Sequence, residues 1–121
     1  MGAGTGATLG KLFGLQRAMK SGLGSATVAL EGSYAGILVA ALAAVNAFGD
    51  VREPDTGKIV AGARRSPESR EFADTAQQMK RGVRGGFPRH STTLVVVATN
   101  ARLSKIQAQK LAQQSQLGVA R

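Results

Sequence analysis

The sequence predicts a layered α+β domain. Residues 92–100 (TTLVVVATN) form a β-branched, apolar run typical of a strand, and residues 103–118 (LSKIQAQKLAQQSQLG) have the composition and spacing of a helix. Shorter strand-type and helix-type runs come before both. The predicted order is strand, strand, short strand, helix, strand, helix, which fits elements packed in layers around one core.

A chain of 121 residues can form one domain but not two independent ones. Its apolar residues are mostly small, because it has only four Phe, one Tyr and no Trp. It also has 16 Gly, whose backbone entropy is costly to lose on folding. The core that such side chains can build is thin, and we therefore expect the chain to be part of a larger protein.

The residue content excludes several kinds of site. The absence of Cys rules out disulfides, thiol catalysis and zinc-thiolate centres, and the one histidine, His90, cannot form a histidine cluster. The apolar run 37–45 is less than half of the roughly 20 residues that a membrane helix needs, and it lacks the flanks of a signal peptide. We expect a cytoplasmic protein that does not enter a membrane.

The first half of the chain is expected to form mainly loops and strands. Residues 1–24 are rich in glycine and predict a loop that passes close to other backbone. Residues 25–31 (SATVALE) and 36–48 (GILVAALAAVNAF) predict a β-hairpin around the turn at 32–34. The second arm is apolar on both faces, as in a central strand covered on each side, although its alanines also suit a buried helix. Residues 58–62 (KIVAG) follow a Pro- and Gly-containing turn and predict a short strand.

Helices are expected in the second half. One is predicted over residues 66–81, because Ser66 stands before a proline in the manner of a helix start. Residues 82–90 predict a flexible, basic linker. In the last helix, Ser104 is expected to cap the start and Gly118 to mark the end. One side of that helix is expected to carry Ile106, Leu111 and Leu117.

Three hydroxyl residues, Ser91, Thr92 and Thr93, stand where the linker meets the strand. The sheet holds a hydroxyl at the start of a strand, while the loop ahead of it can be cut without unfolding the sheet. An amino-terminal nucleophile needs this arrangement, because cleavage of the preceding peptide bond frees an α-amine of pKa roughly 7.7–8.0 that can serve as the base. From the residues alone the pattern is weak evidence, since Thr pairs at strand starts more often reflect β-propensity.

The blocks GAGTGATLGK, SGLGSA and AALAAVNAFGDVREPDTGKIVAGAR, followed by STTLVVVATNARLSKIQAQKLAQQSQLGVAR, cover nearly the whole chain. In this order they resemble the DmpA-type L-aminopeptidase/D-esterase family of amino-terminal-nucleophile hydrolases, which includes β-peptidyl aminopeptidases and the nylon-oligomer hydrolase. The resemblance implies one partial hydrolase domain over residues 1–121, an αββα sandwich of the DmpA/ornithine-acetyltransferase-like type. Residues 1–91 would be the C-terminal part of the large chain and residues 92–121 the N-terminal part of the small chain.

The resemblance also implies roles for particular residues. The family usually cleaves itself at Asn-Thr-Thr or Asn-Gly-Ser, just before the nucleophile. The implied scissile bond therefore joins Ser91 to Thr92, and Thr92 is the implied nucleophile, with Thr93 as the neighbouring alternative; Ser91 stands where Asn is common. Asn46 matches the active-site asparagine whose amide donates to the developing oxyanion. Lys11 matches a lysine near the site in some members.

The function implied is a self-processing aminopeptidase or amidase that acts on peptides or amides through a threonyl acyl-enzyme. The resemblance further implies a homo-oligomer of the full-length parent that needs no metal or organic cofactor and binds no nucleic acid. Family members have a tyrosine upstream and an acidic block downstream that this chain does not contain. We therefore expect little or no activity from this chain by itself.

The charge leaves one alternative open. A formal net charge of +9 would suit a non-catalytic basic module that binds nucleic acid or another polyanion. However, the cations crowd into residues 64–70 and 80–89 without interleaved aromatic residues for base stacking. Steep salt dependence of binding would support this alternative.

Overall fold

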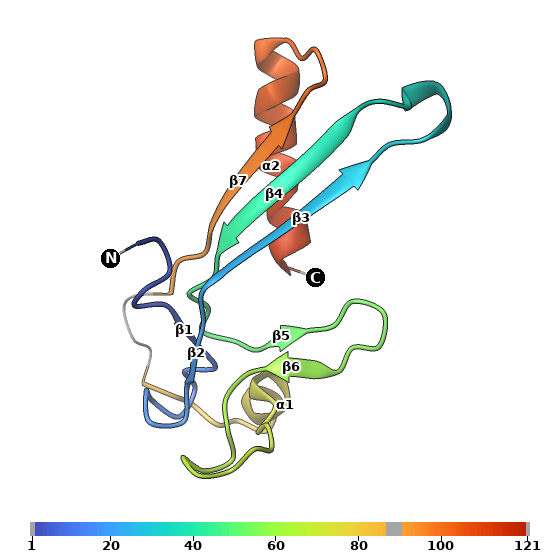
Figure 1. Cartoon of the computed structure of the whole chain (residues 1–121). Helices are drawn as coiled ribbons and strands as arrows, with labels where there is room; N and C mark the ends of the chain where they lie inside the picture. Colours follow the sequence, from blue (N-terminus) through green and yellow to red (C-terminus); the bar gives the residue numbers. More distant parts are fainter. Residues whose placement is uncertain (1, 87–90, 121) are drawn as a thin grey trace.

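The computed structural model describes residues 2–86 and 91–120 and shows two parts placed end to end (Figure 1). One part is a three-stranded antiparallel sheet with a long helix beside it. The other part contains two small two-stranded sheets and a short helix. The α+β class predicted from the sequence is confirmed.

The large sheet has the strand order β3 (Leu23–Ala29), β4 (Leu38–Ala44) and β7 (Leu94–Thr99). β3 and β4 pair antiparallel along their whole length, with the 3-10 turn η1 (Gly32–Tyr34) between them, so the predicted hairpin is confirmed. β7 pairs antiparallel with β4 on the other side. β4 is therefore the central strand, as predicted, and carries the chain from the sheet into the second part.

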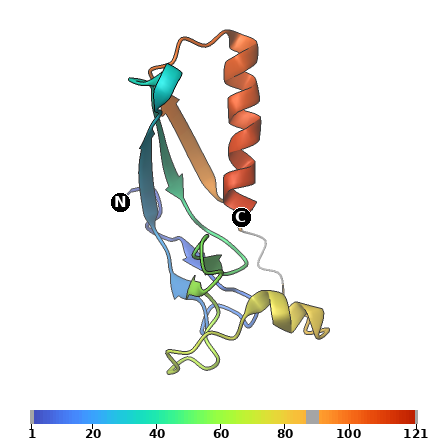
Figure 2. The same ribbon diagram turned by 90° about the vertical axis from the view of Figure 1, so that its right-hand side faces the viewer.

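Only one face of this sheet is covered in the described part of the chain. Helix α2 (Lys105–Ala120) lies against one face and leaves the opposite face open (Figure 2). Because side chains alternate along a strand, the register assigns one set of large side chains to the open face. These side chains, 46–66% exposed, are Leu23, Leu38, Leu42, Leu94 and Val96. The expectation that β4 is covered on each side is wrong, because no helix or strand within 2–86 or 91–120 covers these residues.

Helix α2 begins where the sequence predicts. The Ser104 hydroxyl accepts from the Gln107 backbone N–H at 3.3 Å, and the Gln107 side chain accepts from the Ser104 N–H at 2.8 Å. This reciprocal pair is a capping box. The helix continues through Gly118 to Ala120, so the predicted stop is wrong. Gly118 does not take the left-handed conformation that ends many helices.

The side of α2 that faces the sheet also differs from the prediction. Leu111 does line the space beneath the helix, but Ile106 and Leu117 are 69% and 65% exposed. The residues that share this side with Leu111 are mostly small: Ala108, Ala112, Ser115 and Val119. The side of α2 that faces β7 therefore consists of Leu111 and mostly small side chains, and no residue of the helix is buried.

The second part holds the most tightly packed residues of the described chain. β1 (Thr8–Leu9) pairs with β2 (Met19–Lys20), so the loop prediction for residues 1–24 is wrong at these strands and where β3 begins. The predicted KIVAG strand is confirmed as β6 (Ile59–Ala61), which pairs with β5 (Val51–Arg52). The buried apolar side chains come mainly from the N-terminal segment and are Ala7, Leu9, Leu12, Ala18 and Ala63.

Gly10 is the point where two backbone segments meet most closely. It has a φ of 69°, and a Cβ at this position would collide with the backbone of Gly62 and Ala63. Its N–H donates to the Gly49 carbonyl at 2.9 Å, and the next N–H, that of Lys11, donates to the Phe48 carbonyl at 2.8 Å. The predicted close approach of the glycine-rich segment to other backbone is confirmed here.

The carboxylate of Asp50 fixes the neighbouring elements. Its Oδ1 accepts from the Ala63 N–H at 2.9 Å and from the Thr75 hydroxyl at 2.7 Å, and its Oδ2 accepts from the Thr75 N–H at 2.6 Å. Gly62 lies directly against this carboxylate, where a Cβ would collide with it. Asp50 therefore joins the end of β6 to the start of the short helix.

That helix, α1 (Thr75–Lys80), is shorter than the predicted 66–81. Residues 66–73 instead form turns beside a backbone hydrogen bond from Arg65 to Glu71, and Asp74 caps the helix by accepting from the Gln77 N–H at 3.1 Å. Desolvation by burial raises the pKa of Asp74, but hydrogen bonds from Arg52 and Gln77 and the nearby cations outweigh it and lower the pKa. The helix therefore begins after the Asp74 cap and not at Ser66, where the following proline predicted its start. Of the predicted linker 82–90, residues 87–90, including His90, lie outside the described residues.

We predict that Gly10→Ala destabilises the protein more than Gly57→Ala. Both glycines have nearly the same φ, 69° and 67°, so the left-handed strain of roughly 1–2 kcal/mol is common to both. A Cβ at Gly57 meets no atom within 4 Å, whereas at Gly10 it collides with backbone, which adds about 1–3 kcal/mol. Urea unfolding followed by circular dichroism measures the difference. Equal losses for the two variants would contradict the close approach at Gly10.

Candidate active site

Asn46 lies two residues beyond the end of β4, at the junction of the two parts. Its side-chain Oδ1 accepts from the Thr8 backbone N–H at 3.2 Å and from the Lys11 ammonium at 2.6 Å. Both partners are obligatory donors, so the atom that faces them must be the amide oxygen rather than the nitrogen. The orientation of the amide is therefore fixed, with its Nδ2 donor directed away from Thr8 and Lys11.

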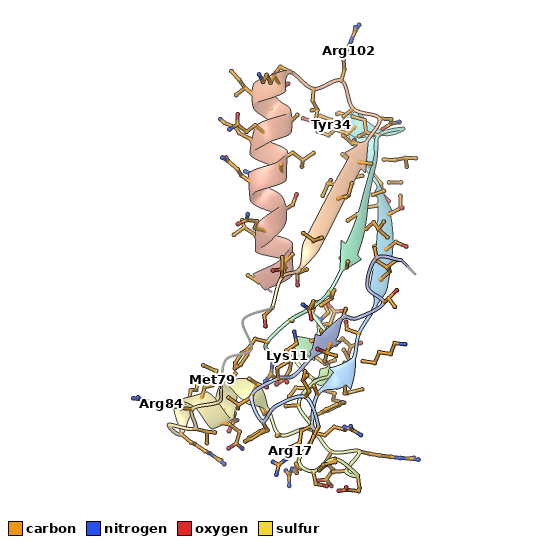
Figure 3. All side chains as sticks on the ribbon, turned by 90° about the vertical axis from the view of Figure 1, so that its left-hand side faces the viewer. Lys11, Arg17, Tyr34, Met79, Arg84 and Arg102 are labelled. Atoms are coloured by element: carbon orange, nitrogen blue, oxygen red, sulfur yellow. The ribbon has the colours of Figure 1, made fainter. Side chains whose placement is uncertain are left out.

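Lys11 is buried, with only 2% of its surface exposed. Figure 3 shows it among the strands at the junction of the two parts. Burial lowers the pKa of its ammonium, because the charged form loses hydration. The short hydrogen bond to Asn46 gives this buried ammonium a polar partner. Such a contact polarises the amide and strengthens it as a donor at Nδ2.

Thr92 precedes β7 by two residues and lines the same pocket as Asn46. The pocket has a volume of about 230 Å³ and lies on the open face of the sheet, where Ala44 and Leu94 sit opposite each other. A glycine-rich turn supplies the rest of its lining, Gly2, Gly4, Thr5, Gly6 and Ala7. The structure thus gathers two of the three predicted catalytic residues in one pocket and connects the third, Lys11, through Asn46.

Ser91 and Thr93 line a different space. Both border the larger cavity of about 1020 Å³ between β7 and α2. This separation follows from the alternation of side chains along an extended chain, which sends Thr92 and Thr93 to opposite sides. Of the two threonines that the sequence left open, Thr92 is the one that shares a pocket with Asn46.

Two parts of the candidate site were not predicted from the sequence. The Thr8 backbone N–H, which donates to Asn46, could not be predicted from residue identity, because every residue except proline carries the same donor. The turn at residues 2–7 was expected only as a loop, although its glycines did indicate close approach to other groups. Among residues 2–86 and 91–120, no group of three or more His, Cys, Asp or Glu side chains could hold a metal ion.

The comparison with known families identifies the chain. The model of peptidase family S58 matches residues 1–121. The chain belongs to peptidase family S58. An uncharacterized aminopeptidase of Mycobacterium leprae (strain TN) is 35% identical to this S58 chain over 127 residues. The resemblance found in the sequence is confirmed at the level of the family.

The match to the mycobacterial protein is unequal in coverage. It includes 100% of the S58 chain but 31% of that aminopeptidase, so the chain spans about a third of the length of this curated relative. Within the part that the structure describes, no helix of the S58 chain is long and apolar enough to cross a membrane.

We predict that Lys11 loses its proton below the ordinary lysine pKa of 10.5, because burial disfavours the charged ammonium. The side-chain amide signals of Asn46, measured by nuclear magnetic resonance during a pH titration, should report this step through the hydrogen bond between the two side chains. In Lys11→Met, which keeps most of the side-chain length without the charge, the same step should be absent. A midpoint at or above 10.5 in the unmodified chain would contradict the prediction.

Proposed function

We propose that this S58 chain carries the nucleophile of a self-processing amino-terminal-nucleophile hydrolase, which removes amino-terminal residues from peptides or related amides through a threonyl acyl-enzyme. The observation that carries the proposal is the shared pocket of Thr92 and Asn46. The family membership and the aminopeptidase relative support the reaction class. The proposal uses no metal ion and no organic cofactor.

Self-processing would begin with Thr92. Its hydroxyl oxygen attacks the carbonyl carbon of Ser91, the bond from that carbon to the Thr92 nitrogen breaks, and the acyl group moves to oxygen as an ester. Water then hydrolyses the ester, which leaves a carboxylate on Ser91 and a free hydroxyl and α-amine on Thr92. The sequence would thereby divide into residues 1–91 and 92–121, which belong to the large and small chains of an αββα sandwich.

The new α-amine would serve as the base in each catalytic turnover. With an ordinary pKa of roughly 7.7–8.0, it can take the hydroxyl proton near neutral pH and return it to the leaving amine. The substrate acyl group is held as an ester on Thr92 until water releases it. Asn46 would donate from Nδ2 to the oxygen on which negative charge develops, and Lys11 would hold and polarise that amide from its other end. We propose further that the full-length protein acts as a homo-oligomer.

The first test is the mass of the purified chain. We predict scission before Thr92, which yields a C-terminal fragment beginning TTLVVV. Thr92→Ala should abolish scission, while Thr93→Ala should keep it, because Thr93 lines the other cavity. Ser91→Asn restores the residue that is usual at this junction in the resembled family, and it should process at least as fast as the unmodified chain.

The result against the proposal is equally specific. If neither the unmodified chain nor Ser91→Asn is cut before Thr92 after prolonged incubation, the threonine does not process this chain. Scission that persists in Thr92→Ala and disappears in Thr93→Ala would transfer the role to Thr93.

We predict that Asn46→Asp and Asn46→Ala slow scission by about 100- to 1000-fold, the usual loss for one oxyanion donor. Asn46→Asp keeps an oxygen for Lys11 and Thr8 but removes the N–H donor, so it separates the chemical role from the role in folding. Rates come from the mass of samples taken over time, and circular dichroism checks that each variant is folded. A rate for Asn46→Asp equal to that of the unmodified chain would show that the amide is not the donor.

A further inference from the structure

We propose that Asp50 is a positioning residue for the candidate site, because its carboxylate sets the place of Lys11 and, through Lys11, the orientation of the Asn46 amide. The inference rests on the proposed function, which gives this lysine and this amide their chemical roles. Asp50 lines neither the pocket beside Thr92 nor the cavity beneath α2. It would therefore influence the reaction only through the backbone segments that it joins.

The place of Lys11 is fixed by two other backbone segments. The first is residues 48–49, whose carbonyls accept from the N–H groups of Gly10 and Lys11, at 2.9 and 2.8 Å. The second is residues 62–63, which approach Gly10 so closely that a Cβ on this glycine would collide with their backbone. With 2% of its surface exposed, Lys11 keeps its buried position only while both segments stay in place.

Asp50 joins these two segments. It follows residues 48–49 directly in the chain, and its Oδ1 accepts from the Ala63 N–H at 2.9 Å. The same carboxylate accepts from the Thr75 N–H at 2.6 Å and from the Thr75 hydroxyl at 2.7 Å, which adds the start of α1 to the cluster. One side chain thus connects the segment that pairs with Lys11 to the segment that packs against Gly10.

The donors around residue 50 require a carboxylate. The N–H groups of Ala63 and Thr75 can only donate, and they meet different oxygens of Asp50. An asparagine has a single side-chain oxygen, so in either orientation its NH₂ group would face one of these N–H groups. Because Ala63 is 0% and Thr75 3% exposed, water cannot readily replace the lost acceptor. Asp50→Asn is therefore a small change that should release one of the joined segments.

A second variant displaces the carboxylate without removing any donor or acceptor. Gly62 lies against the Asp50 side chain, and a Cβ at this position would collide with the carboxylate. Gly62 has no positive φ, so an alanine there adds no left-handed strain. Gly62→Ala should therefore affect Lys11 in the same direction as Asp50→Asn, and it supplies the comparison if Asp50→Asn does not fold.

Asn100→Ala is the matched control. Asn100 follows the end of β7 that lies away from Thr92. Like Asp50, it holds a distant backbone segment through its side chain, since its Oδ1 accepts from the Leu38 N–H and its Nδ2 donates to the Gly36 carbonyl, both at 2.8 Å. Its removal should lower the stability of the fold without disturbing the segments around Lys11.

The experiment follows the side-chain amide signals of Asn46 by nuclear magnetic resonance during a pH titration of each variant. In Asp50→Asn and Gly62→Ala, we expect the midpoint that reports Lys11 deprotonation to rise toward 10.5, because looser packing lets water reach the ammonium. Scission should slow by about tenfold to 100-fold, the scale of loss when a catalytic group is misplaced. Asn100→Ala should leave the midpoint and the rate unchanged while lowering the urea midpoint of unfolding.

A purely structural role would lower stability without moving the titration of the folded chain. An unshifted midpoint in folded Asp50→Asn or Gly62→Ala, a shifted midpoint at an unchanged rate of scission, or an equal shift in Asn100→Ala would each overturn the inference. Circular dichroism checks that each variant is folded.

The titration needs no turnover, so this inference and the proposed function can fail separately. If the midpoint shifts in Asp50→Asn but even the unmodified chain is never cut before Thr92, Asp50 positions the lysine and the threonine chemistry fails. If the unmodified chain is cut, and Asp50→Asn is cut at the same rate with an unshifted midpoint, the threonine chemistry stands and the role of Asp50 fails.

Discussion

The site depends on the carboxylate of Asp50, which accepts three hydrogen bonds from Ala63 and Thr75. These bonds hold the end of β6 against Gly10, where only glycine fits. Gly10 and Lys11 are thereby paired with the backbone of residues 48–49, and Lys11 is carried inward to reach the Asn46 amide. A carboxylate buried without partners would be costly, but each oxygen of Asp50 accepts at least one hydrogen bond. The cluster is therefore stable and holds in place the segment that carries Lys11.

The sequence predicted correctly those strands and caps for which the preference of the local residues agrees with the packing of the whole chain. The β3–β4 hairpin, β7 and the cap at Ser104 follow from β-branched runs, turn residues and one hydroxyl. The start of α1 could not be predicted in this way. The local signal at Ser66 competes with Asp74, whose carboxylate is held by Arg52 from a strand far back in the sequence. The side of α2 that faces β7 was missed because the apolar residues are spread around the helix rather than gathered on one side.

The sequence could predict those members of the candidate site whose side chains have a distinctive chemistry. Thr92, Asn46 and Lys11 came from the resemblance to the family, and the structure brings the first two to one pocket and bonds the last two to each other. The choice between Thr92 and Thr93 could not come from the residues, because it depends on which side of the strand each one occupies. The roles of the Thr8 backbone N–H and of the turn at residues 2–7 could not be predicted either, since main-chain hydrogen bonds do not depend on which residue makes them.

The pairing of β7 with β4 has a chemical consequence. Leu94 lies opposite Ala44 and Thr99 opposite Val39, and this ladder fixes how far β7 is threaded along its neighbour. A slip of one residue would turn every side chain of β7 to the other face. Thr93 would then stand beside Asn46, and Thr92 would point beneath α2. The main-chain hydrogen bonds between β4 and β7 therefore decide which of the two threonines shares a pocket with Asn46.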